Sequence, residues 1–437
     1  MNDLLKTQAA PGKLASVAAA LKRARESEFA QKVAETFATR IAVLVLSVAT
    51  SIVITRLLGP EGRGVFAIAS TLSAVGVQFG DLGLSAANTY FVAKERPLLP
   101  ALTGNALFVS LVMGTLAVLL LAGLAFAWPA LLPSQGMVLL LALLAIPFGL
   151  ALNFTQNLLM GIQDTRGANK VSLWSAILLL ALTAGLGMGR KLTPETALAV
   201  ALLAVGAGFG WMLRRLQSHA AAIRFSLPLL RRSAAYGLKF YVGNFFAFLL
   251  LRSDMLMVGG RLGKETAGFY AVAVTLANLI FMLPNVIGAI LFPRLSATAD
   301  WELKWRTTRQ ALIGTVAIVV ISSVVGGLLA RPFVTLMYGA KFEAAVPAFL
   351  WLLPGMLFWS ASSVLSAYIA SEQIPMRVVV IFFAAFGLNL ALNCAFLTRY
   401  GIVAASVDSS VSYGLAFAAI WVFVALPMRR RHEGILE

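Results

Sequence analysis

The chain has 437 residues, of which 60% are hydrophobic and only 12% are charged, whereas soluble domains carry about 25% charged residues. This composition excludes a soluble protein of this length, because too little charge is available to cover its surface, and it also excludes a disordered chain. A polytopic membrane protein fits both limits. The net charge of +17 would suggest nucleic-acid binding in a soluble protein. Here it matches the excess of Lys and Arg in cytoplasmic loops, so we expect no nucleic-acid partner.

The first 35 residues are polar and basic, and they carry an apolar stripe formed by Leu14, Val17, Leu21 and Phe29. The pattern predicts a cytoplasmic N-terminal segment over residues 1–35. Two interpretations are open: an amphipathic helix resting on the membrane surface, or a solvated tail.

Twelve apolar runs follow, each long enough to cross a bilayer as a helix, which needs about 20 residues. The first six predict an N-terminal lobe over residues 36–213, with spans near 37–57, 65–93, 102–127, 136–162, 168–188 and 195–213. The second span is long, and Gly76, Gly80 and Gly83 predict a bend in it. A basic cytoplasmic connection is predicted over 214–236.

The other six runs predict a C-terminal lobe over residues 237–426, followed by a basic cytoplasmic tail at 427–437. Its spans lie near 237–259, 266–291, 309–329, 346–370, 375–397 and 402–426. With the N-terminus in the cytoplasm, most of the 35 Lys and Arg residues fall on the cytoplasmic side. The positive-inside rule therefore predicts that both termini are cytoplasmic.

An internal repeat relates the two halves. Residues 58–72 read LGPEGRGVFAIASTL and residues 262–276 read LGKETAGFYAVAVTL, so that eight of fifteen positions are identical. Six spans separate the two copies, which leaves the halves in the same orientation. We therefore expect an all-α fold in which two parallel six-helix lobes surround a central cavity, as in transporters. Gly64 and Gly268, at equivalent positions, would allow close helix packing.

No nucleotide-binding, hydrolase or metalloprotease motif occurs in the chain. The single cysteine, Cys394, excludes an intramolecular disulfide and a cysteine-based metal cluster, while His219 and His432 lie far apart in basic stretches. We expect no enzymatic activity, no catalytic residue, no cofactor and no metal site.

Ionisable residues inside the spans are the best indicators of function, because they are unfavourable in lipid. Arg252 and Asp254 lie in the seventh span, two residues apart and therefore on different helix faces. They are interpreted either as a cationic cavity contact tuned by Asp254 or as structural interhelical pairs. Asp81, late in the second span, lines the cavity or caps a helix that restarts after a bend.

Arg40 lies near the cytoplasmic start of the first span, where it either extends toward the membrane surface or lies at the mouth of the cavity. The repeat aligns it with Asn244 in the seventh span. Asn278 and Asn285, in the eighth span, belong to a polar stripe that faces protein or water. These four residues complete the candidate substrate-binding set.

Three runs make the chain resemble a known family. Arg56 to Ala67 reads RLLGPEGRGVFA, Asp81 to Leu84 reads DLGL, and the second half contains GFYA at 268–271 and FPRL at 292–295. The combination resembles bacterial polysaccharide exporters of the Wzx type, also called O-antigen flippases. These form the polysaccharide transporter branch of the MOP superfamily, together with MATE drug antiporters and the peptidoglycan lipid flippase.

The resemblance implies export of an undecaprenyl-diphosphate-linked oligosaccharide across the bacterial inner membrane by alternating access, for O-antigen, capsule or exopolysaccharide synthesis. It implies a monomer whose partners are this lipid-linked substrate, membrane lipids and the polysaccharide polymerase machinery. It also implies cationic cavity residues that hold the diphosphate, a role in which it places Arg252 and Arg40.

Three other functions are considered at this stage, and one of them, a passive lipid scramblase, cannot be distinguished from a flippase by sequence. A cation-coupled multidrug antiporter of the same superfamily would use acidic cavity residues, for which Asp81 and Asp254 are candidates, although Arg252 argues against cationic substrates. A polysaccharide polymerase or ligase would need a long extracytoplasmic loop with catalytic side chains, whereas the outer loops predicted here are all short.

Overall fold

The computed structural model describes residues 28–127, 136–219, 222–372 and 376–432, and these residues fold almost entirely into helices. The helices are α2 (Glu28–Asp81), α3 (Leu84–Lys94), η1 (Arg96–Leu98), α4 (Leu99–Ala127), α5 (Gly136–Gly161), α6 (Thr165–Met188), α7 (Pro194–Gln217), α8 (Leu227–Leu262), α9 (Lys264–Ser296), α10 (Trp301–Met337), η2 (Ala340–Phe342), α11 (Ala345–Glu372) and α12 (Met376–His432). Most of the N-terminal segment predicted over 1–35 lies outside the described residues.

Ten of these helices are long and apolar enough to span a membrane, and two of the ten each supply two spans. The apolar stretches of α2 and α12 are 47 residues long, about 70 Å if straight, whereas the hydrocarbon layer is about 30 Å thick. Helix α2 breaks at Gly59 (φ 68°) and α12 breaks at Gly401 (φ 66°). The positive φ at Gly59 is a conformation that glycine adopts without steric penalty. The described residues therefore form twelve spans, as predicted.

The second predicted span, 65–93, consists of two helices rather than one bent helix. Helix α2 ends at Asp81 and α3 begins at Leu84, with Leu82 and Gly83 both at positive φ between them. The carboxylate Oδ1 of Asp81 accepts a hydrogen bond from the backbone N–H of Ser85 at 3.0 Å. This bond satisfies one of the free donors at the start of α3, so the break is stabilised locally.

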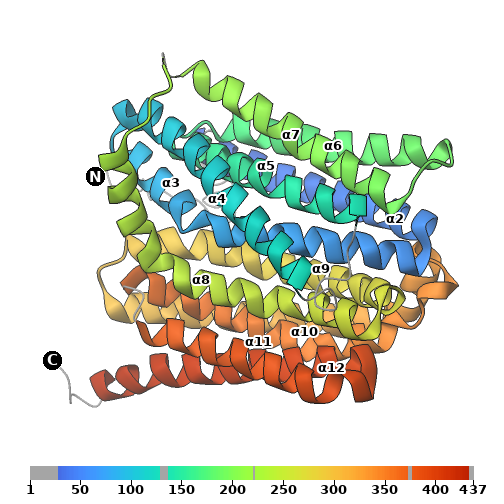
Figure 1. The fold of residues 1–437 in the computed structure, drawn as a ribbon. Coiled ribbons are helices and arrows are strands. Elements are labelled where there is room, and N and C mark those ends of the chain that lie inside the picture. The colour runs from blue at the N-terminus through green and yellow to red at the C-terminus, as the bar shows by residue number, and fades with distance from the viewer. Residues whose placement is uncertain (1–27, 128–135, 220–221, 373–375, 433–437) are drawn as a thin grey trace, which may run out of the picture.

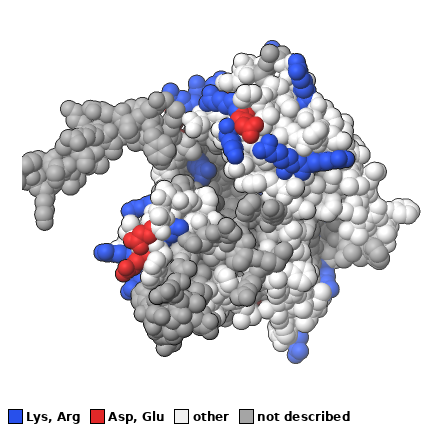
Figure 2. Space-filling model, turned by 90° about the vertical axis from the view of Figure 1, so that its left-hand side faces the viewer, with Lys and Arg blue, Asp and Glu red and all other residues white. Residues whose placement is uncertain are grey.

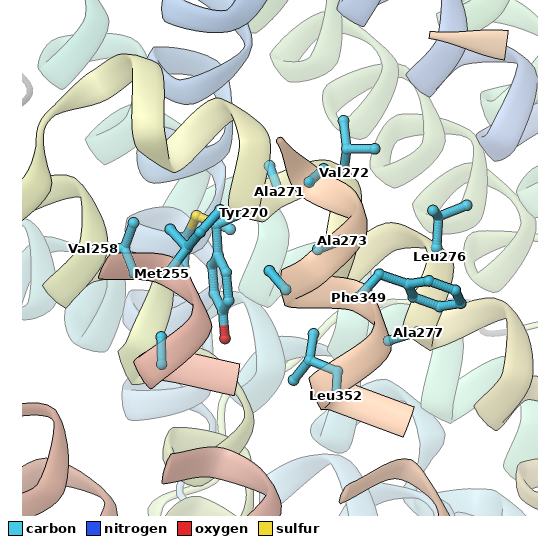
Figure 3. Packing of buried hydrophobic residues seen from close by; sticks show 14 of the residues in the cluster. Met255, Val258, Tyr270, Ala271, Val272, Ala273, Leu276, Ala277, Phe349 and Leu352 are labelled. Atoms are coloured by element: carbon cyan, nitrogen blue, oxygen red, sulfur yellow. The ribbon is translucent and has the colours of Figure 1, made fainter. Parts of the chain in front are cut away.

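The helices form two lobes with separate apolar cores. Helices α2–α7 occupy the upper half of Figure 1 and α8–α12 the lower half. The core of the first lobe centres on α5, with Ile146, Leu150 and Phe154 fully buried. The largest core cluster belongs to the second lobe. Figure 3 shows Tyr270 of α9 beside Met255 of α8, and Leu276 and Ala277 of α9 facing Phe349 of α11.

Both described ends of the chain lie at the same end of the bundle, on the left of Figure 1. We call this the terminal end. The opposite end, where α2 breaks at Gly59 and α9 follows α8 at Gly263, is called the distal end. Each lobe starts its first span at the terminal end, which is the parallel arrangement expected from the repeat.

The connection between the lobes is partly helical. Helix α8 begins at Leu227, so the last ten residues of the predicted 214–236 connection continue directly into the seventh span. This first part of α8 packs on the N-terminal lobe, where the Tyr236 ring stacks on Tyr90 with ring centroids 4.5 Å apart. The segment before α8 is fixed by two hydrogen bonds between the Asn105 side chain and the Ser226 backbone, at 2.9 and 3.0 Å.

Candidate functional site: the cavity between the lobes

A cavity of about 470 Å³ lies between the two lobes. The first lobe contributes residues from α2, α3 and α5, and the second lobe contributes α8 and α11; the polar and aromatic lining residues are Gln78, Asp81, Ser85, Asn157, Tyr241, Asn244, Phe248 and Trp359. A side pocket of about 330 Å³ within the second lobe shares Asn244, Leu251 and Trp359 with this cavity. The two spaces are therefore adjacent.

Seen from the terminal end, the molecule is hollowed at its centre, and basic side chains gather around the hollow (Figure 2). The described basic residues near this end on the first lobe and the connection include Lys94, Arg96, Arg166, Lys170, Arg214, Arg215, Arg224, Arg231 and Arg232. Three of them pair with acids: Arg166 with Glu35, Arg215 with Asp164, and Arg232 with Glu95. The remaining positive charge would attract an anionic headgroup to this opening.

The distal end is closed by contact between the two copies of the repeat. A Cβ placed on Gly64 would lie 1.7 Å from the carbonyl oxygen of Lys264, and one on Gly268 would lie 1.9 Å from that of Pro60. The backbones of α2 and α9 therefore touch directly here. Arg56 adds a second contact, because its Nε donates to the Met337 carbonyl of α10 at 2.8 Å. We call these contacts the distal seal.

Arg252 lies on α8 one turn beyond Phe248, and it is not itself among the residues that line the cavity. Its guanidinium carbon is 6.0 Å from the centroid of the Phe248 ring, which lines the cavity one turn nearer the terminal end. Arg252 is partly exposed and forms no ion pair within the described part of the chain. Its neighbour Leu251 lines both spaces.

Asp254 is buried inside the second lobe and does not line the cavity. It is 3% exposed, and its Oδ2 accepts hydrogen bonds from Tyr270 at 2.8 Å and from Ser409 at 2.6 Å. Asn389 extends this network by donating to Ser409 at 3.3 Å. Arg252 and Asp254 thus contact different neighbours, as their helical spacing predicts.

Oxygen atoms of this buried network remain without hydrogen bonds: Oδ1 of Asp254, Oδ2 of Asp408 and Oδ1 of Asn393. Among the described residues, no group of three or more His, Cys, Asp or Glu side chains could hold a metal ion. The geometry therefore assigns Asp254 first to the packing of α8 against α9 and α12.

Of the other five predicted site residues, Asp81, Asn244, Asn278 and Asn285 differ in their relation to the cavity. Asp81 lines the cavity while capping α3, so both of its proposed roles coincide in one side chain. Asn244 lines both the cavity and the side pocket. Asn278 is exposed and lies one turn from Phe281, which lines the side pocket. The side chain of Asn285 lies outside what the structure describes.

Arg40 is exposed and is not among the residues that line the cavity. It precedes Ser51 by eleven residues, or about 16 Å along the helix and about 20° around it. Ser51 contacts Arg63, which in turn contacts Thr275 of the second lobe, each at 3.3 Å. Arg40 and Ser51 therefore share the face of α2 that is directed toward α9.

Several lining residues were not predicted from the sequence. Trp359 and Tyr241 lie in apolar runs, in which a side chain that faces a cavity cannot be told from one that faces lipid. Tyr241 donates to the carbonyl oxygens of Gln78 and Phe79 at 2.9 and 3.0 Å, and so joins the lobes. Arg63, which does not line the cavity, was also not singled out, because it lies within the repeat. The equivalent residue in the second copy, Ala267, is uncharged.

The fold is that of the MOP superfamily. The chain is similar to an inward-facing multidrug resistance MATE family transporter of that superfamily, with a TM-score of 0.72 and 12% identity over 90% of this chain and 96% of that one. It is also similar to the lipid II flippase MurJ in an inward closed conformation, with a TM-score of 0.70 and 15% identity over 90% and 87% of the chains. An outward-facing MATE family structure gives a lower TM-score of 0.61.

Comparison of sequences is more specific. An uncharacterized membrane protein of Methanocaldococcus jannaschii, MJ1068, is 21% identical over 205 residues, which cover 46% of this chain and 39% of that relative. The family described as polysaccharide biosynthesis protein matches residues 53–347, well over half of the chain. The chain is therefore a multi-pass membrane protein that belongs to the polysaccharide biosynthesis protein family.

Proposed function

We propose that this protein is a flippase that moves an undecaprenyl-diphosphate-linked oligosaccharide from the cytoplasmic to the periplasmic leaflet by alternating access. The observation that carries the proposal is the polar cavity between two lobes that are sealed at the distal end, with the partly exposed Arg252 one turn beyond the lining residue Phe248. A diphosphate that leaves water needs positive partners, and a guanidinium matches phosphate oxygens in a bidentate fork.

The lining of the cavity supports a sugar as the second part of the substrate. Asn157, Asn244 and Gln78 offer amide donors and acceptors, while Trp359 and Tyr241 offer flat apolar surfaces. A few polar groups set among aromatic side chains are typical of ligand sites of this size. The lipid tail would stay in the bilayer, so that the cavity needs to enclose only the headgroup and its sugars.

The terminal end is proposed to face the cytoplasm of a bacterial inner membrane, because basic residues are concentrated there. The cavity would then receive substrate from the cytoplasmic leaflet, and opening of the distal seal would release it outside. An inside-negative membrane potential favours this direction for an anion, by about 2.3 kcal/mol per charge per 100 mV. The exported unit would serve O-antigen, capsule or exopolysaccharide synthesis and pass to the polymerase machinery. We propose that the flippase acts as a monomer.

The proposal is tested by polymer export in cells that carry Arg252→Ala in place of the native residue. Export should be lost while the protein remains at normal levels in the membrane, and Arg252→Lys should restore part of it because the charge is kept. Arg261→Ala is the matched control, because Arg261 lies on the same helix but is exposed at the distal end and bonds to the Cys394 carbonyl. Normal export by a well-expressed Arg252→Ala protein would contradict the proposal.

A second candidate function is cation-coupled export of cationic compounds. The observation that favours it is the carboxylate of Asp81 in the cavity, beside aromatic residues that could stack on a flat cation. This function predicts that cells producing the protein resist cationic dyes and that Asp81→Asn abolishes the resistance. The flippase function predicts no dye resistance from either protein.

A further inference from the structure

Arg63 is a buried arginine whose charge lacks an acidic partner. Its side chain is 8% exposed, and its Nε forms no hydrogen bond. The Nη2 donates only to the hydroxyls of Ser51 and Thr275, each at a long 3.3 Å. It forms no ion pair with any carboxylate that the structure describes. A buried charge without such a partner is unfavourable, and in a membrane protein it indicates a functional site.

The repeat shows that the packing at this position does not require an arginine. The equivalent residue in the second lobe is Ala267, which is fully buried in a well-packed core. Both copies retain the glycine that follows, Gly64 and Gly268, which forms the distal seal. The close approach of the helices therefore depends on glycine, and Arg63 is an addition to the first lobe alone.

Arg63 lies directly beneath the distal seal and bridges the two lobes. Ser51 belongs to the same lobe as Arg63, whereas Thr275 belongs to the other. The next turn of α2 contributes Ala67 and Ile68 to the core cluster of the second lobe. Separation of the lobes at the distal end would remove the Thr275 contact and expose the guanidinium to the cavity.

Three arginines then mark a path along the axis of the molecule. Counted at 1.5 Å per residue from the distal helix ends, the Cα atoms of Arg40, Arg252 and Arg63 lie about 27, 15 and 6 Å deep, and the side chain of Arg63 reaches deeper, to Ser51 and Thr275. Arg40 and Ser51 share one face of α2, and Ser51 contacts Arg63. In the present conformation the terminal end is open and the third arginine is covered.

We infer that Arg63 is a second, distal anion-binding site, which binds the diphosphate of the substrate headgroup after the distal seal opens and before release. The inference rests on the proposed function, and it adds a site that only the outward-open state exposes. Because Arg63 is covered in the inward-open state, Arg252 and Arg63 are not accessible to the diphosphate at the same time. The headgroup therefore passes from Arg252 to Arg63 as the lobes rock.

The test is binding of inorganic diphosphate to the purified full-length protein, measured by titration calorimetry in two conformations. The native protein represents the sealed state. Gly268→Ala represents the opened state, because its added Cβ would overlap the Pro60 carbonyl; Gly64→Ala replaces it if that protein does not fold. In the opened background, Arg63→Gln should weaken diphosphate binding by about tenfold, the effect expected of one charge-assisted contact. In the sealed background it should have no effect.

Arg261→Gln is the matched control, since Arg261 is an exposed arginine at the distal end that bonds to the Cys394 carbonyl within the second lobe and takes no part in the distal seal. It should leave diphosphate binding unchanged in both backgrounds. If the opened proteins with and without Arg63 bind diphosphate equally well, the inference is overturned. The proposed function stays intact in that case as long as diphosphate binding in the sealed state depends on Arg252. Absence of any diphosphate binding by the native protein would contradict the proposed function and this inference with it.

Polymer export distinguishes two roles of Arg63: binding of the substrate anion, and a purely structural contact between the lobes, which we call the latch. Arg63→Gln keeps a donor for Ser51 and Thr275 but removes the charge, whereas Arg63→Lys keeps the charge with different geometry. An anion site predicts that Arg63→Gln exports less polymer than Arg63→Lys at equal protein levels. Normal export by Arg63→Gln would assign Arg63 to the latch alone and overturn the inference.

Discussion

Gly64 and Gly268 occupy equivalent positions in the internal repeat, and each packs against the backbone of the other repeat at the distal end of the molecule. The segment that repeats in the sequence is thus the segment at which the two lobes meet. Because neither glycine has a Cβ, the helices approach to backbone contact at this point. The pair is well suited to a seal that opens and closes.

The seal predicts a simple response to an added methyl group. Gly268→Ala should separate the distal ends of α2 and α9 and expose Thr55, which is fully buried beside them. The measurement is labelling of Thr55→Cys by a membrane-impermeant maleimide in cells, after the exposed Cys394 is replaced by Ala. Labelling should rise severalfold in the Gly268→Ala protein. Equal labelling with Gly and Ala at position 268 would show that this contact is not the closing element.

Asp81 both caps α3 and lines the cavity, and two substitutions distinguish these two roles. Asp81→Asn keeps an oxygen that accepts the Ser85 N–H and removes the charge, so we expect normal folding and polymer export within about twofold. Asp81→Ala also loses the cap, which contributes about 1 kcal/mol, and should lower the melting temperature in detergent. Loss of export in a stable Asp81→Asn protein would show that the carboxylate charge takes part in transport.

Asp254 is expected to act mainly on stability. Asp254→Ala leaves the hydroxyls of Tyr270 and Ser409 without their acceptor, which destabilises the second lobe by about 1–3 kcal/mol. Asp254→Asn retains an acceptor oxygen and should fold nearly as well as the native protein. Thermal melting of the two variants in detergent checks the difference, and similar melting temperatures for the native protein and Asp254→Ala would contradict this role.

Asp164 lies between α5 and α6 at the terminal end, and its ionisation should make the stability of the folded protein depend on pH. Burial alone would raise the pKa of its carboxyl, but hydrogen bonds from Arg215 and the Gly167 N–H, together with the charge of Arg215, outweigh burial and lower the pKa. A carboxyl with a lowered pKa in the folded state stabilises the protein above its unfolded-state pKa, near 3.9. That contribution is lost as the pH falls through the folded-state value.

The matched variant is Asp164→Asn, which keeps a side-chain oxygen at the start of α6 and removes the ion pair. The native protein should be more stable than this variant at pH 7 by less than about 1 kcal/mol, because Arg215 is substantially exposed to solvent. The difference should begin to shrink below about pH 4 and should vanish as the pH falls through the lowered folded-state pKa of Asp164. A difference that persists unchanged at pH 3 would show that the ion pair is not its source.

The fold was largely predictable from the sequence because run length and loop charge are local properties. The interruption between the first two spans followed from run length, and the two parallel lobes followed from the repeat. That Gly64 and Gly268 contact each other could not be predicted, because it depends on how the two lobes dock. The length of α8 was missed for a similar reason: its polar first turns are held by the packing of Tyr236 on Tyr90.

The candidate site was predictable only where a charge interrupts an apolar run. Asp81, which lines the cavity, was singled out in this way. Trp359 was not, because an aromatic residue in a span has no mark that distinguishes cavity from lipid, and the role of Arg252 stays a prediction. Arg63 was read as part of a structural motif, and its isolation from acidic partners is visible only in three dimensions. The order of the three arginines along the membrane axis likewise could not be predicted from the sequence, because it depends on how the helices are assembled.

The central claim, that Arg252 holds the diphosphate of a lipid-linked oligosaccharide, is tested most directly by native mass spectrometry of the gently purified protein. The account predicts a bound species with the mass of a polyprenyl-diphosphate-linked sugar, present in the native protein and absent from Arg252→Ala. The bound mass would also begin to identify the glycan. Retention of the same species by Arg252→Ala, or bulk phospholipid alone on both proteins, would contradict the claim.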